Sequence, residues 1–343
     1  MGTLRIKGTI DVHQFWPNGT SDADTVKLVV TDNSFEFKGT GSGSYFPTSV
    51  FKDASSKGQG TKPVVHVNKS DGVKSITIRV EHLDACELHY KAAPLPKSSS
   101  ITDDMRKKYN SQNKERRQNF GESAAFALGD YLKQFANNKG LIDAFFETNV
   151  DYPSDVVDTY GRFIGNIIIN NKNINLWLVE NGWAFPTFYS SATEQEIQKF
   201  LDAWKKGKNI AKRIGKALTK DANKFDPILL YQKPSANIKF KIGQDAGLAL
   251  MPKIFRRQTT WMVSKLAGII PANTSFKAFL QKSPDELVLI KDFMEFGVHS
   301  APTHYLHEYV DNKNQILKNP EDFVFKEKPS VLVDKNGKKI IHW

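Results

Sequence analysis

Alternating apolar and polar positions predict several short β-strands in the first half of the chain. Residues 4–12 and 25–31 alternate in this way, as half-buried strands do. Residues 75–83 and 163–169 read as further strands, and Asn170–Asn173 has the composition of a hairpin turn. The pattern therefore predicts strands separated by polar, glycine-rich loops.

Helical spacing of apolar residues appears from residue 122 onward. Residues 122–135 place Ala124, Leu128, Leu132 and Phe135 on one face. Residues 174–181 predict a short helix that Gly182 stops. Thr193 then caps a long helix that runs to about residue 218, with acidic residues early and basic residues late, as the helix dipole favours.

The composition changes after about Lys224, where Phe225-Asp226-Pro227 interrupts the basic helix. The remaining residues contain helical candidates and a β-hairpin, at about 247–267, 273–281, 284–296 and 331–342. The fold class expected for the whole chain is α+β, with a smaller, mainly helical C-terminal domain that ends in the hairpin.

Chain length indicates the number of domains, and net charge indicates the kind of binding partner. A chain of 343 residues is too long for one ordinary hydrophobic core and suggests two domains. Hydrophobic residues at 40% and charged residues at 25% are ordinary for a globular protein, but a net charge of +11 is not. The excess positive charge indicates nucleic acid or an acidic membrane surface as partner, although many basic proteins bind neither.

Cys86 is the one cysteine of the sequence, so an internal disulfide is excluded and a reducing compartment is expected. The N-terminal residues lack an apolar signal core, and no run approaches 18 apolar residues. We therefore expect a cytoplasmic protein with no membrane partner, or a secreted one if a signal peptide has been removed.

The residues with most chemical content are Arg79, Asp84 and Glu87, at the end of an apolar run, together with Asp24 and Arg162. Two carboxylates, Asp24 and Asp84, suit a hard ion such as Ca²⁺. Glu87 can hold a water molecule and accept its proton. Each arginine can bind phosphate oxygens through paired N–H groups. These residue types are what a metal-assisted phosphodiesterase needs.

In these residues the chain resembles the staphylococcal nuclease (thermonuclease) family. The resemblance covers about residues 4–218, roughly two thirds of the chain. The matching stretches, in the family's order, are Asp22-x-Asp24-Thr25-Val26-Lys27-Leu28, Arg79-x4-Asp84-x2-Glu87, Phe120-Gly121-Glu122-Ser-Ala-Ala125, Tyr160-Gly161-Arg162, Asn175-x6-Asn181-Gly182-Trp183-Ala184, and the lysine-rich helix after Thr193.

The resemblance implies a five-stranded OB-type β-barrel with packed helices in residues 1–221, followed by an accessory domain of unrecognised type in residues 222–343. It implies Ca²⁺-dependent cleavage of DNA and RNA that leaves 3′-phosphate and 5′-hydroxyl ends. It also implies two insertions near the catalytic face, at about 33–75 and 92–118.

The family's residue roles carry over position by position. Asp24, Asp84 and the carbonyl of Ala85 become metal ligands. Asp22 supports these ligands without binding the metal itself. Glu87 becomes the general base, and Arg79 with Arg162 becomes the phosphate clamp. The expected nucleic-acid contacts are made by Tyr160, by Phe188 or Tyr189, and by the basic residues Lys205, Lys206, Lys212 and Arg213.

Three local departures affect details of the site. Ala23 replaces a glycine and stiffens the turn that carries Asp24, Cys86 replaces a proline, and Thr159 replaces a common lysine. The histidines of the chain (His82, His89, His304 and His307) also allow a transition-metal hypothesis. Surface or interface histidines are the favoured interpretation.

Two other functions stay open beside the nuclease. A barrel of this kind can serve only to bind nucleic acid or a protein partner, although such members typically lose the catalytic carboxylates and arginines. The chain can also be a toxin or defence effector whose C-terminal domain selects the target, binds a partner or inhibitor, and gates the nuclease.

Overall fold

The computed structural model describes residues 1–58, 60–96, 98, 100–213, 241–245, 247, 249–297, 299–327 and 330–343. Contacts divide the chain into two units. The first unit contains residues 1–81, 125–178 and 327–343, and the second contains residues 82–124 and 179–326. The predicted domain boundary at 221/222 lies outside the described residues and stays a prediction.

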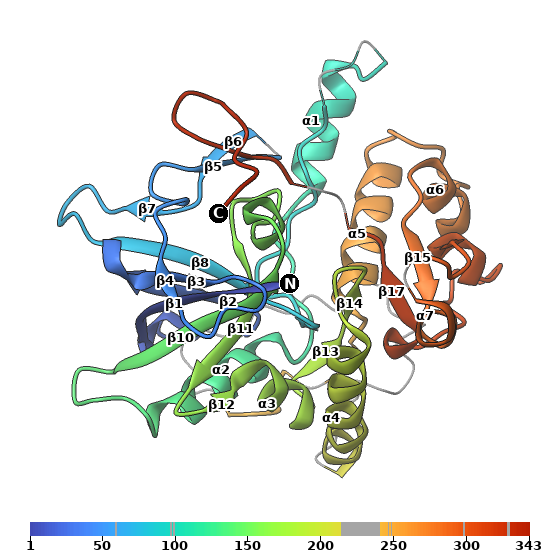
Figure 1. Ribbon diagram of the computed structural model, residues 1–343. Coiled ribbons are helices and arrows are strands. Elements are labelled where there is room, and N and C mark those ends of the chain that lie inside the picture. The colour runs from blue at the N-terminus through green and yellow to red at the C-terminus, as the bar shows by residue number, and fades with distance from the viewer. Residues whose placement is uncertain are drawn as a thin grey trace. The chain divides into compact units, whose positions relative to one another are not determined.

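A closed five-stranded β-barrel forms the first unit, as predicted. Its strands are β1 (Gly2–Asp11), β2 (Thr25–Val30), β8 (Lys74–Val80), β10 (Leu141–Val150) and β11 (Phe163–Ile169). They follow the order β10-β11-β8-β2-β1, and β1 pairs with β10 to close the barrel (Figure 1). Four of these strands agree with the sequence pattern, whereas β10 was not predicted.

The barrel core follows from the period of two along each strand. In β10, Ile142, Ala144, Phe146, Thr148 and Val150 are buried, and the residues between them are exposed or partly exposed. Register places Ile6 of β1 opposite Phe146, whose ring lies 5.8 Å from that of Phe163 on β11. Side chains of alternate residues therefore fill the interior of the barrel.

The predicted insertion at 33–75 is built of short strands: β3 (Phe35–Lys38), β4 (Phe46–Pro47), β5 (Ser55–Gly58), β6 (Gly60–Pro63) and β7 (His66–Val67). Strand β3 pairs with β1, and β7 pairs with β8. Strands β5 and β6 form a separate sheet with β18 (Leu332–Val333) from the end of the chain. The predicted C-terminal hairpin thus contributes a strand to the first unit.

The turns and helices around β11 agree with the sequence pattern. Asn170 and Asn171 adopt positive φ angles of 50° and 58°, as a tight hairpin turn requires, before β12 (Lys172–Asn173). The helices α2 (Gly121–Lys133) and α3 (Ile174–Glu180) match the two predicted ones. Tyr131 of α2 stacks on Trp177 of α3 with ring centroids 4.0 Å apart.

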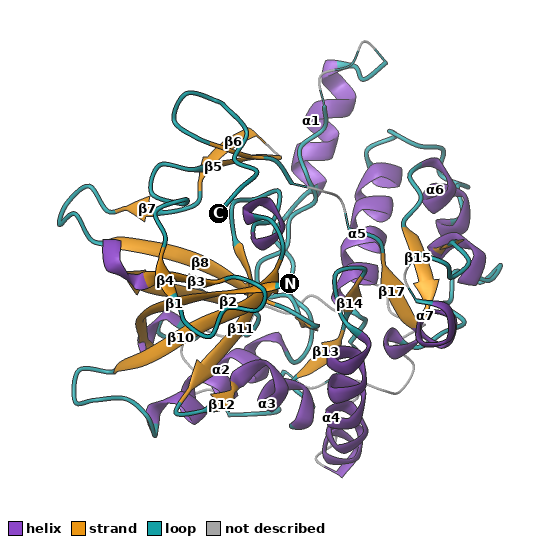
Figure 2. Ribbon diagram, in the orientation of Figure 1, coloured by secondary structure: helices purple, strands orange, loops and turns teal. Residues whose placement is uncertain are grey.

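The second unit is mainly helical, with short strands (Figure 2). Its helices are α1 (Asp103–Gln112), α4 (Glu194–Arg213), α5 (Pro252–Leu266), α6 (Phe276–Lys282) and α7 (Ile290–Phe296). Its strands are β9 (Leu83–Ala85), which pairs with β13 (Ala184–Pro186), and the sheet β14 (Phe188–Tyr189), β17 (Phe323–Phe325), β15 (Glu286–Leu289) and β16 (His304–Tyr305). Short 3₁₀ turns occur in both units, at Val12–Gln14, Asp32–Ser34, Pro153–Val156, Leu306–Tyr309 and Pro320–Asp322.

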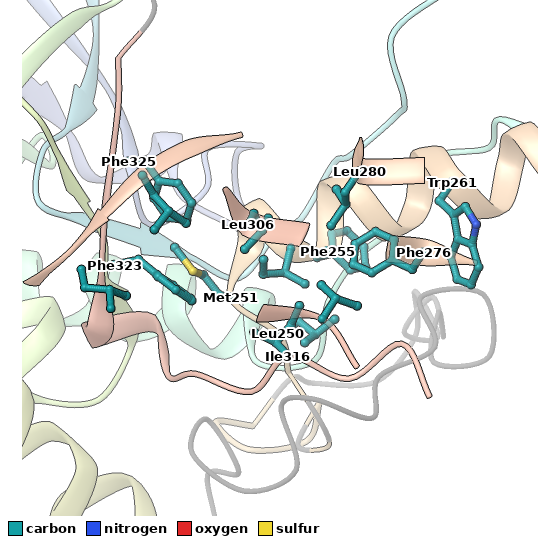
Figure 3. Close-up of a cluster of buried hydrophobic side chains, with 14 residues drawn as sticks. Leu250, Met251, Phe255, Trp261, Phe276, Leu280, Leu306, Ile316, Phe323 and Phe325 are labelled. Carbon is teal, nitrogen blue, oxygen red and sulfur yellow. The ribbon is translucent and has the colours of Figure 1, made fainter. Parts of the chain in front are cut away.

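The C-terminal helices and strands share one apolar core. Figure 3 shows Phe255, Phe276, Leu280 and Leu306 directed toward one another, and these four side chains are fully buried. The same cluster includes Leu250 and Met251 just before α5 and Phe323 and Phe325 of β17. One side of α5 is therefore fixed by hydrophobic burial.

Two elements of the second unit differ from the sequence prediction. Residues 284–296 form β15 followed by α7, not one helix, because Leu287-Val288-Leu289 pairs with β17 and is buried. The second predicted insertion, at about 92–118, contains a helix that the sequence analysis did not predict, α1, whose cap Thr102 accepts a hydrogen bond from the Met105 backbone N–H at 3.2 Å.

The predicted extension of α4 to about residue 218 lies outside the described residues. Among the residues that the structure describes, the helices are too short or too polar to cross a lipid bilayer.

Replacing Phe146 by alanine should lower the free energy of unfolding by about 3–5 kcal/mol, because it opens a cavity in the barrel. Phe145, the next residue on β10, is 38% exposed, so Phe145→Ala should cost about 1 kcal/mol or less. Urea denaturation of both variants measures the difference. Equal losses would show that β10 does not alternate as described.

Candidate functional site

The predicted site residues fall in both units. Asp22, Asp24, Arg79, Tyr160 and Arg162 belong to the first unit. The second unit contains Asp84, Ala85, Glu87, the aromatic pair at 188–189 and the basic residues of α4.

In the first unit, Asp24 and Arg79 form an ion pair. Asp24 directly precedes β2, whose Thr25 pairs with Arg79 near the end of β8. The Arg79 Nη1 atom lies 3.4 Å from Asp24 Oδ2, and Asp24 is 4% exposed. Strand register therefore brings a predicted metal ligand and a predicted phosphate ligand together.

Arg162 is held by the turn that precedes β11. Asp158 Oδ1 accepts hydrogen bonds from the backbone N–H groups of Tyr160 and Arg162, at 2.8 and 2.9 Å. Asp158 Oδ2 accepts from Arg162 Nε at 2.7 Å and also pairs with Nη2. Gly161, with φ of 84°, makes this tight turn possible. One carboxylate thus orients the Arg162 guanidinium, which lies 5.3 Å from the Tyr160 ring centre.

The first insertion lies directly against this turn. Ser56 of β5 donates a hydrogen bond from Oγ to the Asp158 carbonyl at 2.9 Å. Gly58 approaches Thr159 so closely that an added Cβ would lie 2.4 Å from its carbonyl oxygen. Ser330, just before β18, donates to the carbonyl oxygens of Ser154 and Val157. The insertion and the C-terminal strand therefore support the segment that carries Arg162.

Asn175, a residue of the family pattern, has a structural role. Its buried side chain donates to the carbonyls of Gly165 and Glu81, each at 3.1 Å. It also accepts from the Ile167 backbone N–H at 3.2 Å. These bonds join the residue after β8 to β11. Asn175 therefore fixes β8, which carries Arg79, relative to β11, which directly follows Arg162.

In the second unit, Asp84 and Glu87 both bind Arg256 of α5. Arg256 Nη2 lies 2.8 Å from Asp84 Oδ2, and Nη1 lies 3.4 Å from Asp84 Oδ1. The same Nη1 donates to Glu87 Oε1 at 2.5 Å. Asp84 is fully buried in β9, beside Ala85, which pairs with Ala184 of β13. Sequence reasoning missed Arg256, which has no motif around it.

The environment of Arg256 keeps it charged. Burial alone would lower the pKa of its guanidinium, but attraction to the carboxylates of Asp84 and Glu87 outweighs that effect and raises the pKa well above its ordinary value. The guanidinium is therefore a permanent cation beside the predicted metal ligand and general base.

The donor set agrees in type with the ligands that Ca²⁺ prefers, since carboxylates and the Ala85 carbonyl are hard oxygen donors. In the described conformation, however, both oxygens of Asp84 and one of Glu87 contact Arg256. A Ca²⁺ ion on those atoms would compete with the guanidinium for them.

Gln118 fixes the backbone of Glu87. Its Oε1 accepts from the Glu87 N–H at 3.0 Å, and its backbone N–H donates to the Glu87 carbonyl at 2.7 Å. Its Nε2 donates to the Leu250 carbonyl at 2.8 Å. Gly121 stands so close that an added Cβ would lie 3.0 Å from the Cys86 and Glu87 carbonyls. This buried glutamine links the predicted general base to the segment that leads into α5.

The predicted nucleic-acid contacts differ in exposure. Phe188 is fully buried in β14, which does not suit a ring that stacks on a base, whereas Tyr189 is partly exposed. Lys205 and Lys206 are exposed and pair with Asp202 and Glu180, each at 2.8 Å. Lys212 and Arg213 belong to α4, but their side chains lie outside the described part of the chain.

Two histidines near the site lie beside carboxylates. His89 Nδ1 is 3.0 Å from Glu115 Oε1, and His82 Nε2 is 3.8 Å from Glu196 Oε2. His82 is 7% exposed, so it is not the surface histidine that the sequence predicted, whereas His89 is partly exposed.

Comparison with protein families finds a match in the middle of the chain. Residues 102–215 match the family model described as staphylococcal nuclease homologue. The matched segment includes Tyr160 and Arg162, whereas Asp24, Arg79, Asp84 and Glu87 precede it. A search of curated proteins found no match to the chain.

Gln118→Ala should lower the free energy of unfolding by about 2–4 kcal/mol, because it leaves the Glu87 N–H and the Leu250 carbonyl without their buried partner. Gln112→Ala, an exposed change on α1, should alter stability by less than about 0.5 kcal/mol. Denaturant titration of the two variants compares them, and a neutral Gln118→Ala would contradict the role of this side chain.

Proposed function

Because the chain carries a staphylococcal nuclease homologue domain at residues 102–215, we propose that it is a nuclease that hydrolyses phosphodiester bonds of DNA or RNA. The observation that carries this proposal is the Asp158–Arg162 turn inside the matched segment. It orients a guanidinium that is 26% exposed, at the position where the family places a phosphate ligand. The fold of the first unit agrees with the family's barrel.

The proposed reaction is attack of a water molecule on phosphorus. Glu87 accepts the proton of that water through a carboxylate oxygen, and its backbone is held in place by Gln118. Arg79 and Arg162 neutralise the charge of the five-coordinate phosphorus through paired N–H groups. The bond to the 5′ oxygen breaks, and this oxygen takes a proton from solvent, which leaves a 3′-phosphate and a 5′-hydroxyl.

Ca²⁺ is the proposed cofactor. Asp24, Asp84 and the Ala85 carbonyl would hold it, with Asp22 supporting them. A bound Ca²⁺ supplies positive charge to the phosphate and to the attacking water.

Substrate binding uses positive charge outside the proposed catalytic residues. Lys205 and Lys206 are exposed on α4 and can contact phosphates of the chain that is cut. Tyr160, which is 48% exposed, is available to stack on a base. The binding energy of such contacts falls as salt concentration rises.

One observation favours a second function, a binding module without catalysis. Arg256 contacts both Asp84 and Glu87, and such a contact opposes metal binding and proton transfer if it persists. A barrel in that state would still bind nucleic acid through its positive charge.

The test is cleavage of single-stranded DNA and RNA by the full chain, with saturating Ca²⁺ or with EDTA. Glu87→Gln should lower kcat about 10²–10⁴-fold because it removes the proton acceptor. Arg162→Ala should lower it about 10²–10³-fold because it removes stabilisation of the transition state. Glu115→Gln, a partly exposed change beside His89, is the control and should leave the rate unchanged.

Cleavage that survives in both variants would reject the assigned residues. No cleavage by the unmodified protein, together with tight and salt-sensitive binding, would support the binding module instead.

A further inference from the structure

Arg256, Asp84 and Glu87 form a three-residue ionic cluster within the second unit, here called the Arg256 cluster. The guanidinium contacts both oxygens of a fully buried aspartate and one oxygen of a glutamate that is 13% exposed. Because both nitrogens at the end of the side chain are used, this is a fork-shaped contact that lysine cannot reproduce.

The helix that carries Arg256 is fixed on both sides. Phe255, the preceding residue, is fully buried in the C-terminal core (Figure 3). On the side of Arg256, the Tyr90 hydroxyl donates to the Arg256 carbonyl at 3.2 Å and lies 3.3 Å from Thr260 Oγ1. Arg257, the following residue, pairs with Asp285 through Nε at 3.0 Å. These contacts therefore hold the backbone of residue 256 beside β9. The position of the Arg256 side chain next to Asp84 and Glu87 follows from the packing of α5.

The charges of the Arg256 cluster determine how strongly a divalent cation can bind to its carboxylates. Asp84 and Glu87 together carry two negative charges, which match one divalent ion. Arg256 supplies one positive charge and occupies the same oxygen atoms. Attraction between a metal ion and these carboxylates is therefore opposed by repulsion from the guanidinium and by competition for the ligands.

We propose that Arg256 is a built-in competitor of the divalent cation, so that its side chain must leave Asp84 and Glu87 before the metal binds. The C-terminal region thereby controls the metal occupancy of the nuclease domain. This inference rests on the proposed function for the identity of the metal as Ca²⁺. The Arg256 side chain is 26% exposed, which gives it a route to solvent without displacement of α5.

A role of Arg256 as a third phosphate ligand is less compatible with this geometry. A phosphate ligand has to direct its N–H groups at the substrate, whereas both Nη atoms here are directed at carboxylates. To bind phosphate, Arg256 would first have to break the contacts that define the cluster.

The experiment is isothermal titration of the full chain with CaCl₂ in the absence of nucleic acid. Arg256→Gln removes the charge and should lower the Kd for Ca²⁺ about tenfold or more. Arg257→Gln, one residue away and paired with Asp285, is the matched control and should stay within about twofold of the unmodified protein. In the double variant Asp84→Asn/Arg256→Gln, the gain in affinity should disappear because a ligand is lost.

A Kd for Arg256→Gln that equals or exceeds that of the unmodified protein would overturn the inference. So would an equal gain in the Arg257→Gln control, since that would indicate a general charge effect. If Arg256→Gln does not fold, Arg256→Lys decides by the same criterion, because a single ammonium holds both carboxylates less well and should give an intermediate Kd.

Nuclease assays on the same preparations separate this inference from the proposed function. Tighter Ca²⁺ binding by Arg256→Gln without cleavage by any variant supports the competitor and rejects the nuclease. Cleavage by the unmodified protein with an unchanged Kd in Arg256→Gln rejects the competitor alone.

Discussion

Pairing of β1 with β10 is the constraint on which the first unit depends. Ten consecutive residues of each strand pair, from Gly2 with Val150 to Asp11 with Leu141, and this closes the barrel. Closure leaves no free edge among the five strands and fixes the register of β2, β8 and β11. Arg79 then lies near the end of β8, and Arg162 lies in the turn before β11, the strand that pairs with β8.

The second unit depends on charge as well as on apolar burial. A buried aspartate such as Asp84 is unstable without a partner, and Arg256 provides one. The same partner places a cation where the family's chemistry expects a metal. Stability and the proposed metal binding therefore make opposite demands on one side chain, which is common at sites built for function.

Much of the barrel could be predicted from the sequence because its signals are local. Strand β11 and the turn at Asn170–Asn171 need only alternation and residues that tolerate positive φ. Strand β10 alternates equally well, but it comes soon after the helix at residues 121–133 and the sequence analysis did not predict it. Arg256 could not be predicted, because 172 residues separate it from Asp84 and an ion pair leaves no periodic pattern in the sequence. The family pattern located the acidic residues but not their partner.

The pairing of β18 with β5 bears on the order in which the chain folds. Leu332 pairs with Ser56, so this small sheet joins residues that are far apart in the sequence. The barrel strands are complete once residue 169 has been synthesised. The sheet that supports the Asp158 turn, in contrast, has to wait until residue 333 leaves the ribosome. The barrel can thus form before the surroundings of Arg162 are complete, because β18 follows α5 in the sequence and is synthesised after Arg256.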